Sequence, residues 1–368
     1  MFYDFYRGKR VLVTGHTGFK GGWLALWLKH LGARVSGVGL GPPTTPSLHS
    51  IIGDYAFEQQ ADCDVRDLVT LQDRFQNFSP DVVFHLAAQP LVRASFAAPL
   101  ETLQVNALGT ANVLEAIRRI ESPITVIVVT TDKCYENRGW EYGYREIDHL
   151  GGHDVYSMSK AAADLIAQSW QRSFFATNPK LGNVATARAG NVIGGGDYAE
   201  DRIVPDCVRA LIEKRGIVVR NPASTRPWQH VLDCLSGYLL LGARLALAEK
   251  TTPLASAFNF GPGACANRPV GDLVEEFLKA WPGQWQHVPP TGAPHEAAKL
   301  NLAIDKAAAL LNWFPVWLFE EAVLNTATWY HERHLLNNPR MVEFSLAQIE
   351  SFTNAARKNK LAWAQTSA

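Results

Sequence analysis

The sequence lacks an excess of either charge, is poor in cysteine, and has no long uninterrupted apolar run. Lys and Arg together number 35 and Asp and Glu also number 35, so the formal net charge of the 368 residues is zero. Proteins that bind nucleic acid or another polyanion usually carry a basic excess, and balanced charge argues against that class. It does not exclude a local basic pocket for a phosphate group.

The spacing of the few cysteines indicates neither a disulfide framework nor a zinc module. They are odd in number and share no short paired spacing: Cys63, Cys134, Cys207, Cys234 and Cys265. Such a pattern fits neither a disulfide scaffold nor a zinc module, so we expect a reducing compartment. His331 and His334 lie three residues apart without a third ligand nearby, and we predict no metal site.

No segment predicts secretion or a membrane span. The first residues lack the basic-then-apolar order of a signal peptide. The most apolar later stretch, 238–248, contains Arg244 and is shorter than the ~20 residues that cross a bilayer. We therefore expect a cytoplasmic protein with neither nucleic acid nor a membrane as its partner.

The first half of the chain alternates apolar runs with helical periodicity, and 47% hydrophobic residues against 19% charged ones suffice for a large core. The predicted strands are 10–14, 34–40, 82–86, 124–130 and 184–189, and the predicted helices are 24–31, 102–119 and 154–175. Strands that alternate with helices form βαβ units. We expect an α/β fold, a Rossmann-like doubly wound parallel sheet with a smaller, loop-rich lobe.

A glycine-rich segment, Gly-His-Thr-Gly-Phe-Lys-Gly-Gly over 15–22, joins the first strand to an amphipathic helix. Glycines at 15, 18 and 21 can turn sharply and bring the backbone close to a pyrophosphate. The helix that follows offers free N–H groups and its positive dipole end to that anion. An ordinary glycine-rich turn is the alternative, but the strand before and the helix after favour dinucleotide binding.

This spacing resembles the extended short-chain dehydrogenase/reductase superfamily, as does His-Leu-Ala-Ala-Gln at 85–89. The resemblance implies that Asp64 and Val65 meet the adenine and that Asn106 is a structural polar residue; Asp64 could instead cap a helix. The cofactor-binding residues that it implies are Gly15, Thr17, Gly18, Phe19, Gly21, Asp64, Val65, Leu86, Ala87, Ala88, Tyr156 and Lys160. The segment 37–42 holds neither an acid for a ribose 2′-hydroxyl nor an arginine for a 2′-phosphate, and we predict NAD rather than NADP.

Tyr156 and Lys160 form a YxxxK pair, which places both side chains on one face of a helix. A phenol with a pKa near ~10 is a poor base at neutral pH, and a cationic lysine or an oxidised nicotinamide ring stabilises its phenolate. The motif alone is common by chance and also fits a solvated helix face. Downstream of the glycine loop, at the distance typical of this superfamily, it predicts the catalytic pair.

Thr131, Asp132 and Lys133 follow the apolar strand 124–130. A turn with a local hydrogen bond is the plain interpretation, but strand carboxyl ends are also where such sheets present ligand-contacting groups. Nucleotide-sugar 4,6-dehydratases carry two ionisable residues directly after this threonine. Lysine at the second of these positions, where other branches have glutamate, makes residues 8–335 resemble the CDP-glucose branch of these enzymes.

The resemblance implies a mechanism in which Tyr156 takes the C4 hydroxyl proton while C4 gives hydride to NAD. We hypothesise that Lys133 removes the C5 proton, which requires a pKa lowered by burial or by Lys160, and that Asp132 protonates the departing C6 hydroxyl. Hydride then returns to C6. Because strand residues alternate sides, both side chains reach one sugar only if the strand has ended by Asp132. An ion pair between Lys133 and a carboxylate is the alternative.

The second half is broken by glycine and proline, and it predicts a lobe over the carboxyl ends of the strands. We divide the chain into an NAD-binding domain over 1–190, to which part of 230–260 returns, a mainly substrate-binding lobe over 191–335, and a tail over 336–368 of unknown role. The substrate-binding residues implied by the resemblance, with Arg226 on the pyrophosphate, are Gln89, Asn191, Arg202, Arg226 and His295.

Two other functions remain open at this point. A 4-epimerase or another nucleotide-sugar 4,6-dehydratase would keep Tyr156 and Lys160, although an epimerase needs no acid–base couple such as Asp132 and Lys133. A non-catalytic NAD(P)-binding regulator would tend to lose the tyrosine or the lysine. The resemblance also implies a homodimer, or a dimer of dimers, formed through the helices at 102–119 and 154–175.

Overall fold

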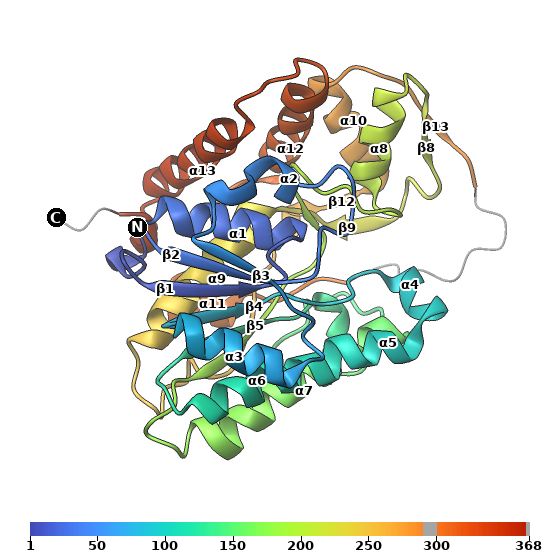
Figure 1. The fold of residues 1–368 in the computed structure, drawn as a ribbon. Helices are drawn as coiled ribbons and strands as arrows, with labels where there is room; N and C mark the ends of the chain where they lie inside the picture. The colour runs from blue at the N-terminus through green and yellow to red at the C-terminus, as the bar shows by residue number, and fades with distance from the viewer. Residues whose placement is uncertain (290–299, 366–368) are drawn as a thin grey trace.

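Seven parallel strands form the central sheet in the spatial order β11-β6-β5-β4-β1-β2-β3 (Figure 1). The structure, a computed structural model, describes residues 1–289 and 300–365. The strands of this sheet are β1 (Arg10–Thr14), β2 (Arg34–Gly39), β3 (Gln59–Asp62), β4 (Val82–His85), β5 (Thr125–Val129), β6 (Val184–Arg188) and β11 (Ala257–Asn259). The chain winds outward from β1 to β3 and then returns to β4 on the other side of β1. This is the doubly wound topology that we predicted, with its switch point between β1 and β4.

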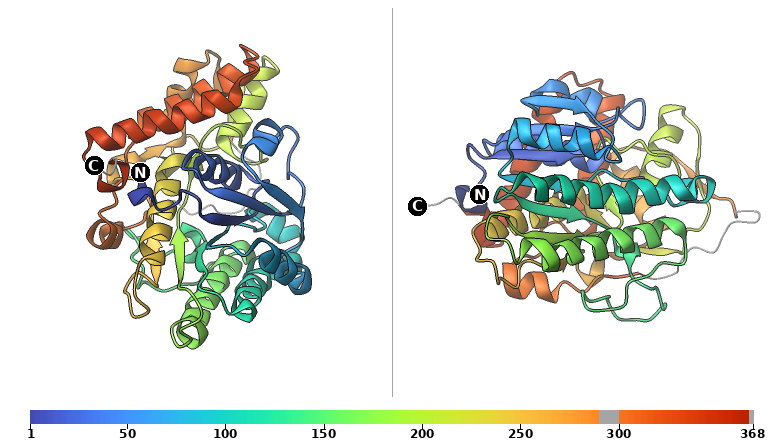
Figure 2. Two further views of the ribbon diagram at one scale, coloured as in Figure 1. Left: turned by 60° about the vertical axis from the view of Figure 1, so that its left-hand side comes forward. Right: turned by 60° about the horizontal axis from the view of Figure 1, so that its bottom comes forward.

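Helices cover both faces of the sheet (Figures 1 and 2). One face carries α3 (Leu68–Phe78), α6 (Gly109–Ile120) and α7 (Val155–Trp170), and the other carries α1 (Phe19–His30), α9 (Val231–Ala246) and, packed on α1, α13 (Met341–Lys358). The apolar residues of strand β1 do not alternate with polar ones, and the packing of the strand explains why. Val11 and Val13 belong to the core beside α1 and α9, whereas Leu12 belongs to the core beside α3 and α6. A strand that is buried on both sides needs apolar residues at every position.

The second lobe lies beside the carboxyl ends of the strands. Its strands form three short pairs: β7 (Val192–Ile193) with β10 (Gln229–His230), β8 (Ile217–Val219) with β13 (Trp285–His287), and β9 (Thr225–Pro227) with β12 (Asn267–Pro269). The remaining helices are α2 (His49–Ile52), α4 (Val92–Ala97), α5 (Pro99–Leu103), α8 (Ile203–Ile212), α10 (Val270–Ala280), α11 (Asp305–Leu311) and α12 (Phe319–His334). Among the described residues, no helix combines the length and the apolar character that crossing a membrane requires.

Two sequence expectations need correction, and the tail of unknown role is found to contribute to the core. Helix α1 is not amphipathic: residues 21–28 are all buried, because the sheet, α9 and α13 enclose it. The helix expected at 102–119 is interrupted by a π-helical turn at Gln104–Leu108, and α7 ends at Trp170 in a second such turn, Gln171–Phe175. The tail over 336–368 is part of the core, because Phe352 and Trp363 pack against Trp27 of α1.

Candidate active site and cofactor cleft

The glycine loop folds back against the end of β4. Gly15 has a φ of +72°, and a Cβ atom there would lie 2.6 Å from the backbone nitrogen of Ala87. At Gly21 a Cβ would lie 2.3 Å from the carbonyl oxygen of Gly15. Thr17 Oγ1 donates to the carbonyl of Leu40 at 2.9 Å and ties the loop to the end of β2. The loop therefore leaves room for a ligand at its backbone only because side chains are missing, which is the cradle that a pyrophosphate requires.

The other predicted cofactor residues lie at the same edge of the sheet. Leu86, Ala87 and Ala88 directly follow β4, and Phe19 at the start of α1 packs against Gly194 of the second lobe. Asn106, in the π-helical turn, donates to the carbonyl of Gln89 at 3.1 Å and to Ser159 Oγ of α7 at 2.8 Å. This asparagine is therefore the structural link between β4 and the helix that carries Tyr156.

Asp64 and Val65 follow β3 at the far side of the glycine loop. The Asp64 carboxylate accepts from the Arg66 guanidinium at 2.6 Å, which lowers the pKa of that carboxyl. The alternative role of Asp64 as a helix cap is wrong, because α3 begins at Leu68 and Asp67 is its cap. Val65 is buried and packs against α6, where a Cβ on Gly109 would lie 2.7 Å from its side chain.

Tyr156 and Lys160 lie on one buried face of α7, as their spacing predicts, but their hydrogen bonds go to different partners. Burial raises the pKa of Tyr156 to about 12, and a hydrogen bond with Thr131 opposes that rise. Lys160 Nζ donates to the carbonyl of Val129 at 2.9 Å. Burial, and then the charge of Lys20, lower the pKa of Lys160 to about 8. The phenol is thus harder to ionise than in water, and it needs added positive charge to act as a base.

Strand β5 ends at Val129, and Asp132 begins a 3₁₀ turn, Asp132–Cys134. The condition that the strand end by Asp132 is therefore met. The Asp132 side chain is 1% exposed, its Oδ1 accepts from Thr131 Oγ1 at 3.0 Å, and its Oδ2 has no hydrogen-bond partner among the described residues. A buried carboxylate oxygen without a hydrogen-bond partner is energetically costly, so Asp132 is a polar group that burial does not explain.

Lys133 lies in a more open position than its neighbour. Its side chain is 39% exposed, and its Nζ lies 3.5 Å from Asp132 Oδ1. This is the ion pair that we kept as the alternative to a free base. The geometry thus brings Thr131, Asp132, Lys133 and Tyr156 together at the carboxyl end of β5.

Sequence reasoning missed Lys20, which lies in the first turn of α1 within the glycine loop. Burial lowers the pKa of its ammonium, whose electrostatic neighbours include Asp132 and Lys133. It is also the cation that acts on Lys160. The Lys20 ammonium has no hydrogen bond or ion pair within residues 1–289 and 300–365. The position of this lysine within the glycine-rich segment 15–22 was the signal in the sequence that could have identified it.

The predicted substrate-binding residues divide into two groups. Asn191 directly follows Gly190 in a left-handed conformation (φ 48°), and Arg202, paired with Asp197 at 2.7 Å, is an electrostatic neighbour of Tyr156. Arg226 lies on β9, where it donates to Ser224 Oγ at 2.7 Å.

Two further predicted residues stand apart from these groups. Gln89 uses its amide locally: Nε2 donates to Thr102 at 3.0 Å, and Oε1 accepts from the backbone of Leu91. His295 lies outside the described residues.

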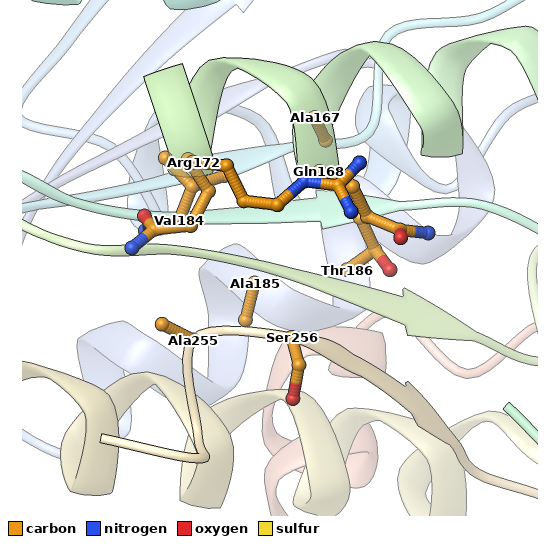
Figure 3. A pocket seen from close by; sticks show the side chains of 9 residues that line it. Ala167, Gln168, Arg172, Val184, Ala185, Thr186, Ala255 and Ser256 are labelled. Atoms are coloured by element: carbon orange, nitrogen blue, oxygen red, sulfur yellow. Dashed lines mark hydrogen bonds between the residues drawn. The ribbon is translucent and has the colours of Figure 1, made fainter. Parts of the chain in front are cut away.

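A small cavity of about 150 Å³ lies elsewhere, between the end of α7, the start of β6 and the segment before β11 (Figure 3). Gln168 and Arg172 border it from the helix, and Thr186 and Ser256 from the sheet side. It opens at the amino-terminal half of β6, away from the strand ends that carry the candidate active site. We assign it no role in the chemistry.

Comparisons with known proteins agree with this geometry. The model of the GDP-mannose 4,6-dehydratase family matches residues 12–326. The chain is 42% identical over 360 residues to the CDP-glucose 4,6-dehydratase of Salmonella typhimurium, covering 96% of this chain and 99% of that protein. The chain therefore belongs to the GDP-mannose 4,6-dehydratase family.

Solved structures show the same fold. An epimerase from Methanothermobacter thermautotrophicus superimposes with a TM-score of 0.75 at 24% identity, covering 91% of this chain and 96% of that one. A dTDP-glucose 4,6-dehydratase from Streptomyces venezuelae, solved with NAD bound, gives 0.72 at 22% identity, covering 90% and 99%. At these identities the matches establish the fold.

Proposed function

We propose that this protein is a CDP-glucose 4,6-dehydratase, which removes water from CDP-glucose to give CDP-4-keto-6-deoxyglucose with NAD as a retained cofactor. The observation that carries the proposal is the Asp132–Lys133 turn, which lies beside Thr131 and Tyr156 at the carboxyl end of β5. The 42% identity to the Salmonella typhimurium enzyme supports CDP-glucose as the substrate. An epimerase needs only the tyrosine and lysine, so the second pair of ionisable groups favours dehydration.

The residues around the glycine loop fit NAD. Gly15, Thr17, Gly18, Phe19 and Gly21 would hold the pyrophosphate, and the residues after β3 and β4 would hold the adenine end of the cofactor. When bound, NAD accepts hydride from the sugar C4 and returns it to C6. The absence of an acid and of a nearby arginine after β2 supports NAD over NADP.

The residues of the chain supply the proton transfers. Tyr156, beside Thr131, takes the C4 hydroxyl proton, and Lys160 adds positive charge from the same helix face. The ketone at C4 then acidifies the C5 proton, for which Lys133 is the proposed base once the proton of its ammonium has moved to Asp132, whose Oδ1 lies 3.5 Å away. Lys133 gives the proton back to C5 when C6 receives hydride. Asp132, with its unpartnered Oδ2, gives a proton to the departing C6 hydroxyl. The net change is loss of one water without net oxidation.

The second lobe, mainly 191–335, would bind the nucleotide part of the substrate, opposite the NAD-binding part of the chain. Arg202 and Asn191 lie at the catalytic end of this lobe, and Arg226 on β9 is the proposed partner of the pyrophosphate. Gln89 and His295 complete the proposed set. A guanidinium suits this task because it can bind two phosphate oxygens at once.

We also propose that the protein dimerises through α5, α6 and α7. Large apolar side chains are exposed on α5, on α7 and on the π-helical turn before α6, among them Leu100, Leu108, Met158 and Leu165. Apolar groups at this spacing on neighbouring helices suit a four-helix bundle between two copies. A cytoplasmic location remains the expectation from the sequence.

The test is to incubate the purified protein with CDP-glucose, dTDP-glucose, UDP-glucose and GDP-mannose and to record the alkali chromophore of a 4-keto product. We expect a signal with CDP-glucose, and a Tyr156→Phe variant that loses roughly 10²–10⁴-fold in rate. A signal with another nucleotide sugar alone would overturn the substrate assignment. An epimerised product without chromophore would support a 4-epimerase, and NAD binding without any product would support a regulator.

A further inference from the structure

A fully buried arginine lies behind the candidate active site. Arg188, the last residue of β6, has 0% exposure, as does its partner Asp164. Its Nε and Nη2 donate to the two Asp164 carboxylate oxygens at 2.8 and 2.7 Å. Its Nη1 donates to the Tyr135 hydroxyl at 2.6 Å, and its guanidinium lies 4.9 Å from the centre of the Tyr135 ring.

Burying a guanidinium is expensive unless every donor is used, and an apolar residue of similar size is often as stable. Stability alone therefore does not explain Arg188. Its Nη1 also donates to the backbone carbonyl of Glu146 at 3.2 Å. Its two side-chain partners belong to different halves of the candidate active site. Asp164 lies one helical turn beyond Lys160 on α7, and Tyr135 directly follows the turn that carries Asp132 and Lys133.

Each partner is tied to its own half. The Asp164 carboxylate also accepts from Thr130 Oγ1 at 3.0 Å and from Gln168 at 2.7 Å, which joins α7 to the end of β5. The Tyr135 hydroxyl donates to Asn259 Oδ1 of β11 at 2.7 Å. The backbone nitrogen of Tyr135 donates to the carbonyl of Asp132 at 3.4 Å, which ties Tyr135 to the 3₁₀ turn.

We propose that Arg188 is a positioning residue that fixes the Asp132–Lys133 turn relative to Tyr156 and Lys160, with the Tyr135 hydroxyl as its link to the turn. The role rests on the proposed dehydration, because only that reaction needs both pairs of groups on one sugar. The bidentate contact with Asp164 holds α7, the helix that carries Tyr156 and Lys160. The short contact with the Tyr135 hydroxyl holds the turn that carries Asp132 and Lys133. A shift of about 1 Å between such groups costs on the order of 10²-fold in rate.

The decisive variant is Tyr135→Phe, since Arg188→Met leaves Asp164 as an unpaired buried charge that can prevent folding. Tyr135→Phe keeps the ring and its contact with the guanidinium and removes only the hydroxyl. Its matched control is Tyr144→Phe. Tyr144 stacks on Tyr135 at 5.2 Å, but its hydroxyl bonds to Asn137 and Arg138 rather than to Arg188.

We expect Tyr135→Phe to lower kcat by about tenfold to a hundredfold with KM within about twofold, and to slow deuterium incorporation at C5 in parallel. Tyr144→Phe should leave kcat within about twofold. A second measurement does not depend on catalysis. Cys134 lies in the turn and is fully buried, so its alkylation by a thiol reagent, mapped by mass spectrometry, should accelerate about tenfold in Tyr135→Phe and stay unchanged in Tyr144→Phe.

Equal losses of activity in the two variants, or unchanged kcat and Cys134 labelling in Tyr135→Phe, would overturn the positioning role. Failure of the proposed function is a separate result, because the wild-type protein would then form no 4-keto product from CDP-glucose. The comparison between the two variants would still be made by Cys134 labelling, and by turnover of whichever nucleotide sugar the wild-type protein accepts.

Discussion

The carboxylate of Asp132 lies so close to Gly190 that a Cβ atom on residue 190 would be 1.8 Å from Asp132 Oδ2. Gly190 does not have a left-handed backbone, so the need for glycine comes from the carboxylate alone. We expect Gly190→Ala to displace Asp132 and to lower product formation by roughly 10²-fold. Overpacking should cost only about 1–3 kcal/mol of unfolding free energy. Steady-state turnover and thermal unfolding measure the two effects.

Gly216→Ala is the matched control. It makes the same chemical change at a glycine whose nearest atom to an added Cβ is the Gln284 carbonyl oxygen at 3.9 Å. We expect turnover within twofold of wild type. If Gly190→Ala also keeps turnover within that range, Asp132 does not need this position to act as the acid.

Lys20 is expected to set the pH range in which the protein works. Its charge is one of the causes that lower the pKa of Lys160 to about 8, after burial. Tyr156 needs a cationic Lys160 to ionise, so activity should decline at alkaline pH as Lys160 loses its proton. Removing the charge in Lys20→Met raises the pKa of Lys160, and the alkaline limb of the profile of kcat/KM against pH should move to higher pH.

Lys20→Arg keeps the charge, and its alkaline limb should stay near that of the wild type. The absolute rate is a weaker measurement, because either substitution can also weaken the binding of a ligand. A limb that stays in place in Lys20→Met, or that moves to lower pH, contradicts an electrostatic link between Lys20 and Lys160.

Five of the seven strands of the sheet could be predicted, because β1, β2, β4, β5 and β6 are largely apolar runs. Helices α6 and α7 could be predicted from their helical period. Strand β3, Gln59–Asp62, was not predicted, since this edge strand has no apolar run and a largely exposed or half-buried pattern. The sequence assigns no role to the tail over 336–368, yet Phe352 and Trp363 of this tail pack against α1. This contact depends on where the end of the chain meets α1, and the local sequence pattern does not encode that position.

The candidate site was predicted where sequence spacing alone decides which residues lie close together. Tyr156 and Lys160 share a helix face by their spacing, and Asp132 follows a strand that ends at Val129. Arg188 and Tyr135 could not be found in the same way, because β6 and the turn meet only once the sheet has formed. For the same reason the exposure of Lys133 was not visible in the sequence.

The proposed dimer predicts that Leu165→Lys separates the copies. Leu165 is 50% exposed on α7, and a charge there would be buried without a partner in a helix bundle. Sedimentation velocity should show a dimer or a larger assembly for the wild type and a shift toward monomer for the variant. Leu247→Lys, at an exposed residue after α9, is the control that should not change the assembly. A wild-type monomer, or no shift in Leu165→Lys, contradicts this interface.

Asp233 is expected to make the protein less stable as pH rises toward 8. This carboxyl on α9 is fully buried, its Oδ1 accepts from the backbone nitrogen of Val316 at 2.6 Å, and its Oδ2 has no partner among the described residues. Burial raises the pKa of Asp233 to about 8. The folded state therefore keeps a proton that the unfolded state, with a pKa near ~3.9, releases.

The stabilisation from that proton is complete below pH ~3.9 and is lost as pH rises through the folded pKa. Between pH 6.5 and 8, this one group should lower the free energy of unfolding by about 2 kcal/mol. Asp233→Asn cannot ionise but still presents an oxygen to Val316, so its stability should vary less over the same range. Urea unfolding at several pH values measures both slopes, and equal slopes would show that Asp233 does not carry this proton in the folded state.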